Sequence, residues 1–138
     1  MSDTTRSTLP CKHLSVSIPK SYDAVYGFLR DPETWKLWAS GLGEMRHDAA
    51  RGVWTAEQES GQATIVFSPP NADGILDHRV TLPDGSEVYV PMRAIANGDH
   101  TEIMLTLFRQ PGMADATWAR DEEWVRKDLE RLTQQFQS

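Results

Sequence analysis

The clearest pattern of hydrophobic and polar positions lies near the end of the chain, in residues 117–137. Apolar side chains recur there at intervals of three, four or seven residues, which places them on one face of a helix. This apolar stripe consists of Trp118, Val125, Leu129, Leu132 and Phe136. Charged and amide side chains occupy most of the other positions, so the pattern predicts an amphipathic helix that covers a partner surface.

Two carboxylates lie close to the start of this stripe. Asp121 and Glu122 fall within about 60° and about 40° of its centre by the same helical geometry. They either face the surface that the helix covers or belong to solvent-exposed first turns, where negative charge suits the positive end of the helix dipole. The pattern leaves both interpretations open.

Most of the preceding chain alternates between apolar and polar residues with the period of a β-strand. Residues 13–18 predict a half-buried first strand that ends before a proline. Shorter alternating runs predict further strands at residues 44–47, 53–57, 63–67, 75–82, 87–95 and 101–109.

Two short helices are predicted between the first strand and the rest of the sheet. The first begins at Tyr22 with Ser21 as its N-cap. The second begins at Pro32, a residue that suits the first helical position, with Asp31 as its N-cap and Gly41 as its end.

The hairpin of residues 75–82 and 87–95 is the most informative segment. Its connection, Pro83-Asp84-Gly85, suits a type I turn followed by a glycine in the left-handed region, which pairs residue 82 with residue 86. This register sorts the side chains onto two faces, whereas a two-residue turn would mix them. The interior face then carries Leu76, His78, Val80, Leu82, Val88, Val90, Met92 and Ala94. The outer face carries Asp77, Arg79, Thr81, Glu87, Tyr89, Pro91 and Arg93.

These elements predict an α+β fold, in which a curved antiparallel sheet of six to seven strands is covered by the long C-terminal helix. A chain of 138 residues suits one domain, which we expect to span residues 12–138 after a loose tail at residues 1–11. This tail lacks the apolar core of a secretion signal, and the single cysteine, Cys11, allows no disulfide within the chain. Both features favour a cytoplasmic protein.

Charge and motifs narrow the function classes. The net charge of −6, with both signs interleaved, gives no basic face for nucleic acid, and no apolar run approaches the ~20 residues of a membrane span. The sequence has no glycine-rich phosphate loop, nucleophile elbow or paired metal-ligand motif. We therefore expect no metal and no nucleotide or flavin cofactor.

His78 is the strongest candidate for chemistry, because the hairpin register places it on the interior face. An imidazole there either exchanges a proton with a bound ligand or is a core histidine satisfied by a nearby hydroxyl or carbonyl. Glu122 is the candidate catalytic partner of His78, and Tyr89 is the alternative residue that would assist it. Burial should lower the pKa of His78 unless a carboxylate such as Glu122 lies close enough to raise it.

Apolar and aromatic side chains around the same face predict a ligand pocket. The predicted lining consists of Trp54, Leu76, His78, Val80, Val90, Met92, Leu105, Trp118, Glu122 and Val125. The larger of these side chains would equally fill a core. Trp35 and Trp38 are interpreted as structural residues that fix the short helices to the sheet.

Over residues 12–137 the order of elements resembles the START-like helix-grip superfamily, also called SRPBCC. The resemblance rests on Ile18-Pro19-Lys20-Ser21 leading into Val25 and Phe28, on Asp31-Pro32-Glu33 with Trp35 and Trp38, and on the late helix. Residues 76–80 and 106–113 are similar to segments of uncharacterised bacterial members of the polyketide cyclase/dehydrase-like group.

This resemblance implies a cavity between the sheet and the long helix, but it does not fix a reaction, because the superfamily hosts carriers, receptors, cyclases and chaperone activators. Binding of a small hydrophobic or aromatic molecule in the cavity is the leading hypothesis. The alternatives are a cyclase, dehydratase or isomerase that uses His78, and a module that binds a protein partner.

Overall fold

The structure, a computed structural model, describes residues 8–40, 44–58 and 60–137. Its helices are α1 (Tyr22–Leu29), the 3-10 helix η1 (Pro32–Leu37) and α2 (Asp115–Gln134). The strands of this part of the chain are β1 (Cys11–Ile18), β2 (Met45–Asp48), β3 (Val53–Gln58), β4 (Gly61–Phe67), β5 (His78–Thr81), β6 (Glu87–Val90), β7 (Met92–Asn97) and β8 (His100–Phe108).

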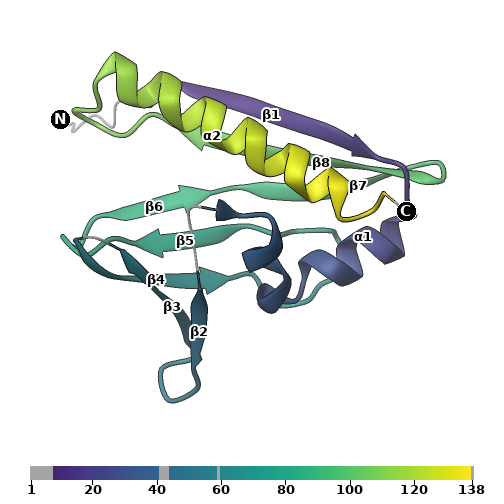
Figure 1. The fold of residues 1–138 in the computed structure, drawn as a ribbon, viewed down its shortest axis with the longest axis horizontal. Helices are drawn as coiled ribbons and strands as arrows, with labels where there is room; N and C mark the ends of the chain where they lie inside the picture. Colours follow the sequence, from purple (N-terminus) through teal and green to yellow (C-terminus); the bar gives the residue numbers. More distant parts are fainter. Residues whose placement is uncertain (1–7, 41–43, 59, 138) are drawn as a thin grey trace, which may run out of the picture.

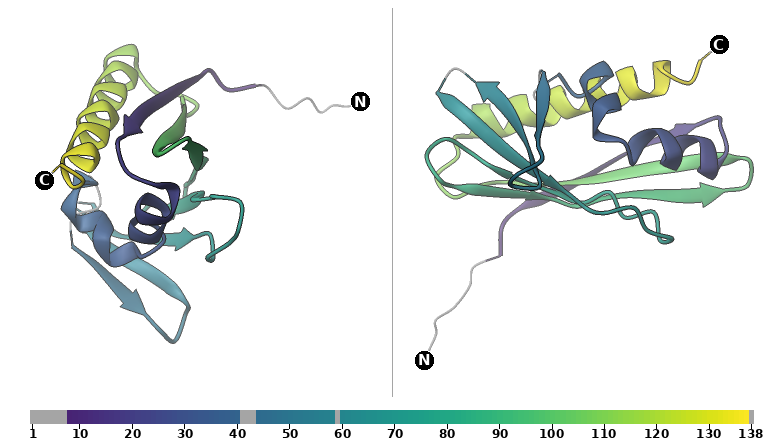
Figure 2. Two further views of the ribbon diagram at one scale, coloured as in Figure 1. Left: turned by 90° about the vertical axis from the view of Figure 1, so that its right-hand side faces the viewer. Right: turned by 90° about the horizontal axis from the view of Figure 1, so that it is seen from below.

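The strands form two antiparallel sheets under the long helix (Figure 1). One sheet has the order β1-β8-β7, and the other has the order β2-β3-β4-β5-β6. Helix α2 lies along the three-stranded sheet, while α1 and η1 lie beside its C-terminal end (Figures 1 and 2). The rings of Phe28 and Phe136 fix this end, with centroids 5.1 Å apart. The predicted α+β arrangement with a covering helix is confirmed.

A single sheet of six to seven strands is not confirmed, because the ladder divides at Pro91. Proline has no N–H to donate, and the Pro91 carbonyl accepts from the backbone N–H of Thr106 at 3.0 Å. Asp77 Oδ1 accepts a hydrogen bond from the next backbone N–H, that of Met92, at 2.8 Å. Strand β6 therefore pairs with β5, and β7 pairs with β8.

The predicted hairpin register is confirmed on both sides of this interruption. The backbone N–H of Leu82 donates to Ser86 O at 2.8 Å, and an isolated bridge between Ile75 and Arg93 continues the same register. Gly85 has a φ of +89°, the left-handed conformation that the predicted turn requires. The interior face of the hairpin is thereby fixed by local turn chemistry.

The two short helices begin as predicted. Ser21 Oγ accepts from the backbone N–H of Ala24 at 3.2 Å, and Asp31 Oδ1 accepts from that of Glu33 at 3.0 Å. The predicted end of the second helix, Gly41, lies outside the described residues.

Helix α2 begins earlier and ends earlier than the predicted 117–137. Ala114 occupies the N-cap without a side-chain hydrogen bond. Asp115, in the first turn, pairs with Arg109 at 2.7 Å, and this ion pair holds the turn before the helix. The apolar stripe still faces the sheet, since Leu129 and Leu132 are fully buried.

Candidate ligand-binding cavity

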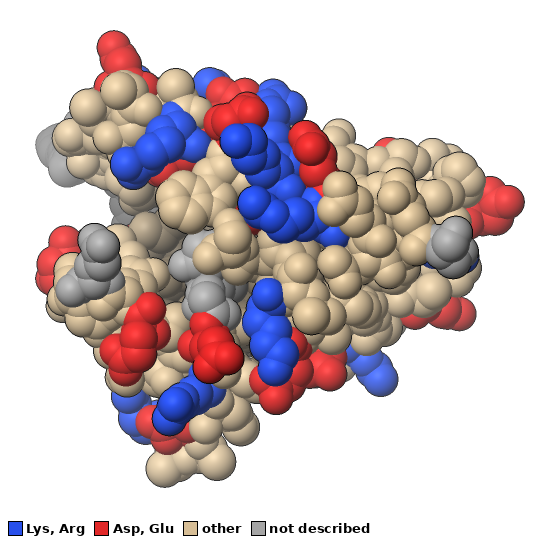
Figure 3. Space-filling model, viewed as in Figure 1, with Lys and Arg blue, Asp and Glu red and all other residues tan. Residues whose placement is uncertain are grey.

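A cavity of about 340 Å³ lies between α2, both sheets and the segment after η1. Its lining consists of Trp35, Trp38, Ala39, His78, Val80, Leu82, Val88, Val90, Leu105, Leu107, Asp121, Val125 and Asp128. The face drawn in Figure 3 is hollowed between the helix and the five-stranded sheet. Ten of the 13 lining residues are apolar, and the volume falls within the range of about 300–1,000 Å³ that small-molecule sites occupy.

An aromatic cluster forms one wall of the cavity. The Trp35 ring packs edge-on against the His78 ring, with centroids 4.8 Å apart, and lies 4.8 Å from the Trp38 ring. Trp35 is held in place because its indole N–H donates to Leu29 O at 2.8 Å. The 3-10 helix thus brings two tryptophans against the histidine of β5.

His78 is a neutral hydrogen-bond acceptor in this wall. Its Nδ1 lies 3.2 Å from Leu76 O, and because a carbonyl oxygen only accepts, Nδ1 carries the proton. Burial lowers the pKa of His78 to about 4, since desolvation of the charged ring outweighs the smaller opposing effects of the Leu76 hydrogen bond and Asp77. The lone pair on Nε2 then has no partner among the described residues.

Trp38 contributes an unpaired donor to the same wall. The side chain is buried, at 3% exposure, and its indole Nε1–H has no hydrogen-bond partner among the residues that the structure describes. A buried donor of this kind costs about 1–3 kcal/mol when it is left unpaired. The residues that line the cavity therefore include Trp38, with an unpaired buried donor, and His78, with an unpaired acceptor.

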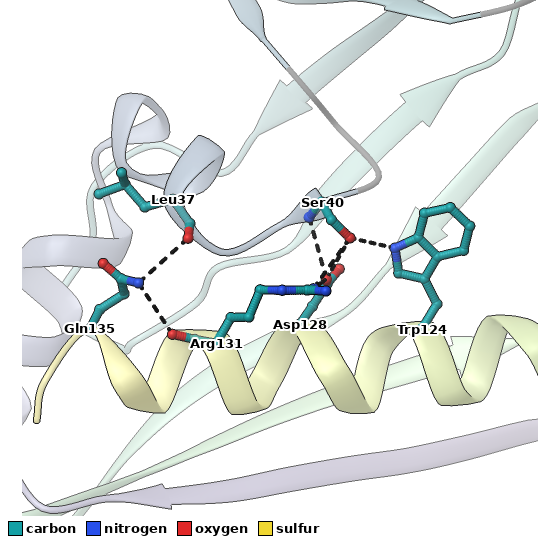
Figure 4. A network of polar contacts seen from close by, with 6 residues as sticks. All are labelled: Leu37, Ser40, Trp124, Asp128, Arg131 and Gln135. Atoms are coloured by element: carbon teal, nitrogen blue, oxygen red, sulfur yellow. Dashed lines mark hydrogen bonds and ion pairs between the residues drawn. The ribbon is translucent and has the colours of Figure 1, made fainter.

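Asp128 joins α2 to the segment after η1 (Figure 4). Its Oδ1 accepts from Ser40 Oγ at 2.8 Å, from Ser40 N at 3.3 Å and from Arg131 Nη1 at 2.6 Å. The indole N–H of Trp124 donates to Ser40 Oγ at 2.5 Å. Burial raises the pKa of Asp128, although its bonds from Ser40 and the charge of Arg131 act against this rise. This cluster closes one side of the cavity.

Asp121 lies at the rim, with 36% of its side chain exposed. A smaller outer hollow of about 260 Å³ is lined by Leu107, Asp121, Trp124, Val125 and Asp128. Four of these five residues also line the main cavity, so the two spaces adjoin along Leu107, Asp121, Val125 and Asp128.

Five of the predicted site residues come together in this cavity: His78, Val80, Val90, Leu105 and Val125. Leu76 and Met92 share their hairpin face but are fully packed in the core, at 6% and 1% exposure. Trp54 lies on β3, where its ring packs against the ring of His47, with centroids 4.9 Å apart. These three residues do not line the cavity.

Glu122 and Trp118 also lie outside the cavity, because both face Lys12 of β1. Glu122 forms ion pairs with Lys12 and, at 2.8 Å, with Arg126, and both partners lower the pKa of its carboxyl. The Lys12 ammonium lies 5.1 Å from the centre of the Trp118 ring. The predicted pairing of Glu122 with His78 is therefore not formed.

The outer face of the hairpin carries the remaining candidates. The Tyr89 hydroxyl donates to Asp77 Oδ2 at 2.9 Å, and Arg79 pairs with Glu87 at 3.1 Å. Arg93 is exposed, as the register predicts. Tyr89 therefore does not lie in the cavity, and the described residues contain no group of three or more His, Cys, Asp or Glu side chains placed to hold a metal.

Sequence reasoning missed the contributions of Trp35, Trp38, Ala39, Leu107 and Asp128. The two tryptophans were interpreted as structural, and nothing local places the 3-10 helix opposite α2. Leu82 and Val88 carried a usable signal, since the register had already put them on the interior face. So did Asp121, through its closeness to the apolar stripe.

Comparison with protein-family models and with curated proteins finds no match. Among solved structures, DynU16, a protein in the dynemicin biosynthetic locus, is 18% identical and superimposes on 90% of this chain with a TM-score of 0.66. A START superfamily protein from Mycobacterium smegmatis is 14% identical, with a TM-score of 0.61 over 92% of this chain and 99% of its own. The chain has a START-like fold.

A third structural neighbour is the Aha1 dimer from Colwellia psychrerythraea, which is 12% identical and has a TM-score of 0.67 over 93% of this chain and 96% of its own. Identities this low establish the fold and not the activity. The chain spans about half of DynU16, 46% of its length. None of the described helices is both long and apolar enough to span a membrane.

Proposed function

We propose that this START-like protein binds a small apolar or aromatic molecule in the cavity beneath α2. The apolar lining carries the proposal, because filling this space would remove hydrocarbon surface from water on both partners. The START-like neighbours support it only through their fold. DynU16 lies in the dynemicin biosynthetic locus.

The cavity also gives its ligand a polar requirement. Trp38 offers a buried donor and His78 offers an acceptor, and neither is paired among the described residues. A ligand that carries one acceptor and one donor would satisfy both groups without breaking an internal hydrogen bond. This favours an aromatic molecule with polar substituents over a plain hydrocarbon.

An enzyme that uses His78 is the second candidate, because His78 lines the cavity with a free lone pair. A pKa of about 4 makes this ring a weak base near neutral pH, where a general base works best with a pKa near the working pH. Glu122, its predicted partner, is paired with Lys12 instead. Binding without turnover therefore has the stronger support.

Native mass spectrometry of the protein purified under non-denaturing conditions tests the proposal directly. A bound small molecule, released on denaturation, is the expected result. A stable second protein chain in place of a small molecule would favour the partner-binding alternative.

A cavity-filling variant tests whether the ligand binds in this cavity. N-phenyl-1-naphthylamine, an apolar dye that becomes fluorescent in apolar surroundings, serves as the probe. Val88→Trp should weaken its binding at least about tenfold, because the indole would occupy the cavity. The control is Val66→Trp, the same change at a residue of β4 that is 48% exposed and lies outside the cavity. Equal effects of the two variants would contradict the proposed site.

A further inference from the structure

The polar groups of the cavity are mostly acceptors. The lining includes two carboxylates, Asp121 and Asp128, and a neutral imidazole, His78, whose Nε2 also accepts. Trp38 supplies the one unpaired buried donor found among the described side chains. No described lining residue is Lys or Arg, so a bound anion would have no cationic partner in the wall.

Asp121 and Asp128 differ in how strongly a neighbouring cation compensates their negative charge. Arg131 Nη1 lies 2.6 Å from Asp128 Oδ1, and Ser40 adds two hydrogen bonds. Asp121 pairs with Arg120 at 3.7 Å, and the Arg120 side chain is 66% exposed, so solvent weakens the interaction. Asp121 therefore keeps more of its negative charge available at the rim.

The carboxylates also lie too far apart to act on one point charge together. They are seven residues apart on α2, which corresponds to about 10 Å along the helix axis. A cationic group at the rim would therefore be recognised mainly by Asp121. Trp124, 45% exposed, lines the outer hollow beside it and offers an aromatic surface, which also favours cations.

Trp38 is an observation independent of the carboxylates that points to a ligand. Its side chain is buried among the residues that line the cavity and its indole N–H is unpaired, so a ligand acceptor that reaches this N–H would remove the cost of leaving it unpaired. A neutral ether or carbonyl oxygen meets this requirement without bringing negative charge near Asp121 and Asp128.

We propose that the cavity selects apolar amines, whose apolar body packs against the valines and leucines of the lining and whose ammonium group lies beside Asp121. This selectivity rests on the proposed function, since it names the ligand class of the same cavity. The proposed selectivity excludes fatty acids and other apolar anions as preferred ligands. Their negative charge would lie near two carboxylates, and no Lys or Arg among the lining residues would compensate it.

Three compounds that share one naphthyl ether body test the selectivity: 2-(1-naphthyloxy)ethylamine, 2-(1-naphthyloxy)ethanol and (1-naphthyloxy)acetate. At pH 7 they are cationic, neutral and anionic, and each carries an ether oxygen for Trp38. Isothermal titration calorimetry should give a Kd for the amine about five- to tenfold lower than for the alcohol, and the acetate should bind most weakly. The advantage of the amine should shrink as salt is raised.

Asp121→Asn should remove the advantage of the amine over the alcohol, because the charge that attracts the ammonium group is lost. Glu123→Gln is the matched control, because it removes the same charge from an exposed position of α2 outside the lining. Binding of the acetate as tightly as the amine, or an advantage that survives Asp121→Asn, would overturn the selectivity.

The alcohol separates this inference from the proposed function. If the alcohol binds and Val88→Trp abolishes its binding, a missing amine advantage overturns the selectivity alone. If none of the three compounds binds while N-phenyl-1-naphthylamine does, the selectivity alone is overturned. If the dye does not bind either, the proposed function is overturned as well.

Discussion

Replacement of His78 by phenylalanine should make stability less dependent on pH. The wild-type imidazole is buried, at 7% exposure, and packs edge-on against Trp35. Phenylalanine preserves the approximate shape and cannot be protonated. At pH 7 the variant should be less stable by about 1–3 kcal/mol, because Leu76 O loses its hydrogen bond.

The pH dependence follows from the lowered pKa. The folded protein holds His78 at about 4, against 6.5 for the free group, so the unfolded chain binds the proton more tightly. Stability from this group is fully present above pH 6.5 and is lost as the pH falls toward 4. The difference between 6.5 and about 4, at 1.36 kcal/mol per pH unit, limits the loss to about 3.4 kcal/mol. About 2 kcal/mol should be lost by pH 5 and about 3 kcal/mol by pH 4.

Urea unfolding at pH 7, 6, 5 and 4 measures this loss. Far-ultraviolet circular dichroism is the suitable signal, because protonation of His78 could alter the fluorescence of neighbouring Trp35. The stability of wild type relative to His78→Phe should fall by about 3 kcal/mol from pH 7 to pH 4, which closes or reverses the difference expected at pH 7. The contributions of titratable groups that both proteins share cancel in this comparison. His100→Phe is the control, since the His100 side chain is 48% exposed. A gap that stays constant with pH, or an His78 ring that titrates near 6.5 by nuclear magnetic resonance, would refute the reasoning.

Three further predictions concern residues that shape the cavity and its supports, and urea unfolding at pH 7 measures each. Gly74→Ala should cost more than about 2 kcal/mol, because a Cβ would lie 2.2 Å from a backbone oxygen at a φ of +70°, whereas Gly98→Ala, at a φ of +62° in open space, should cost about 1–2 kcal/mol. Trp35→Phe should cost about 1–3 kcal/mol more than Trp38→Phe, because only the Trp35 indole N–H has a partner within the described residues. Asp128→Ala should cost about 1–3 kcal/mol, and Asp128→Asn should cost less, because the amide oxygen still accepts from the segment after η1. Reversal of the order within any of these pairs would contradict the corresponding contact.

The parts of the fold that could be predicted from sequence depend on short-range rules. Ser21 and Asp31 cap their helices because a side-chain oxygen reaches a backbone N–H within three residues. The turn that ends at Gly85 sets the hairpin register, and the register alone places His78 on the interior face. No long-range information is needed for any of these predictions.

The missed parts of the site depend on how distant elements meet. Trp38 and Ser40 follow a 3-10 helix whose position against α2 is set by packing and not by its own sequence. Asp128 falls outside the apolar stripe, yet it is buried because α2 contacts two surfaces, β1 on one side and the segment after η1 on another. An apolar stripe predicts only one covered face of a helix. The pattern therefore did not predict that the side of α2 with Asp128 is also covered, or that Ser40 contacts it.

The interruption at Pro91 also explains why the interior face of the hairpin lines a cavity instead of a closed core. A continuous ladder between β6 and β8 would hold facing side chains about 5 Å apart. Without it, the two strands diverge away from the junction of β6 and β7 (Figure 1). Val88 and Val90 then line one side of the space and Leu107 lines another, while α2, Trp35 of the 3-10 helix and Trp38 just after it cover the space. The same proline that divides the sheet thus leaves room for a ligand, and the groups that would recognise that ligand come from the elements that close the gap.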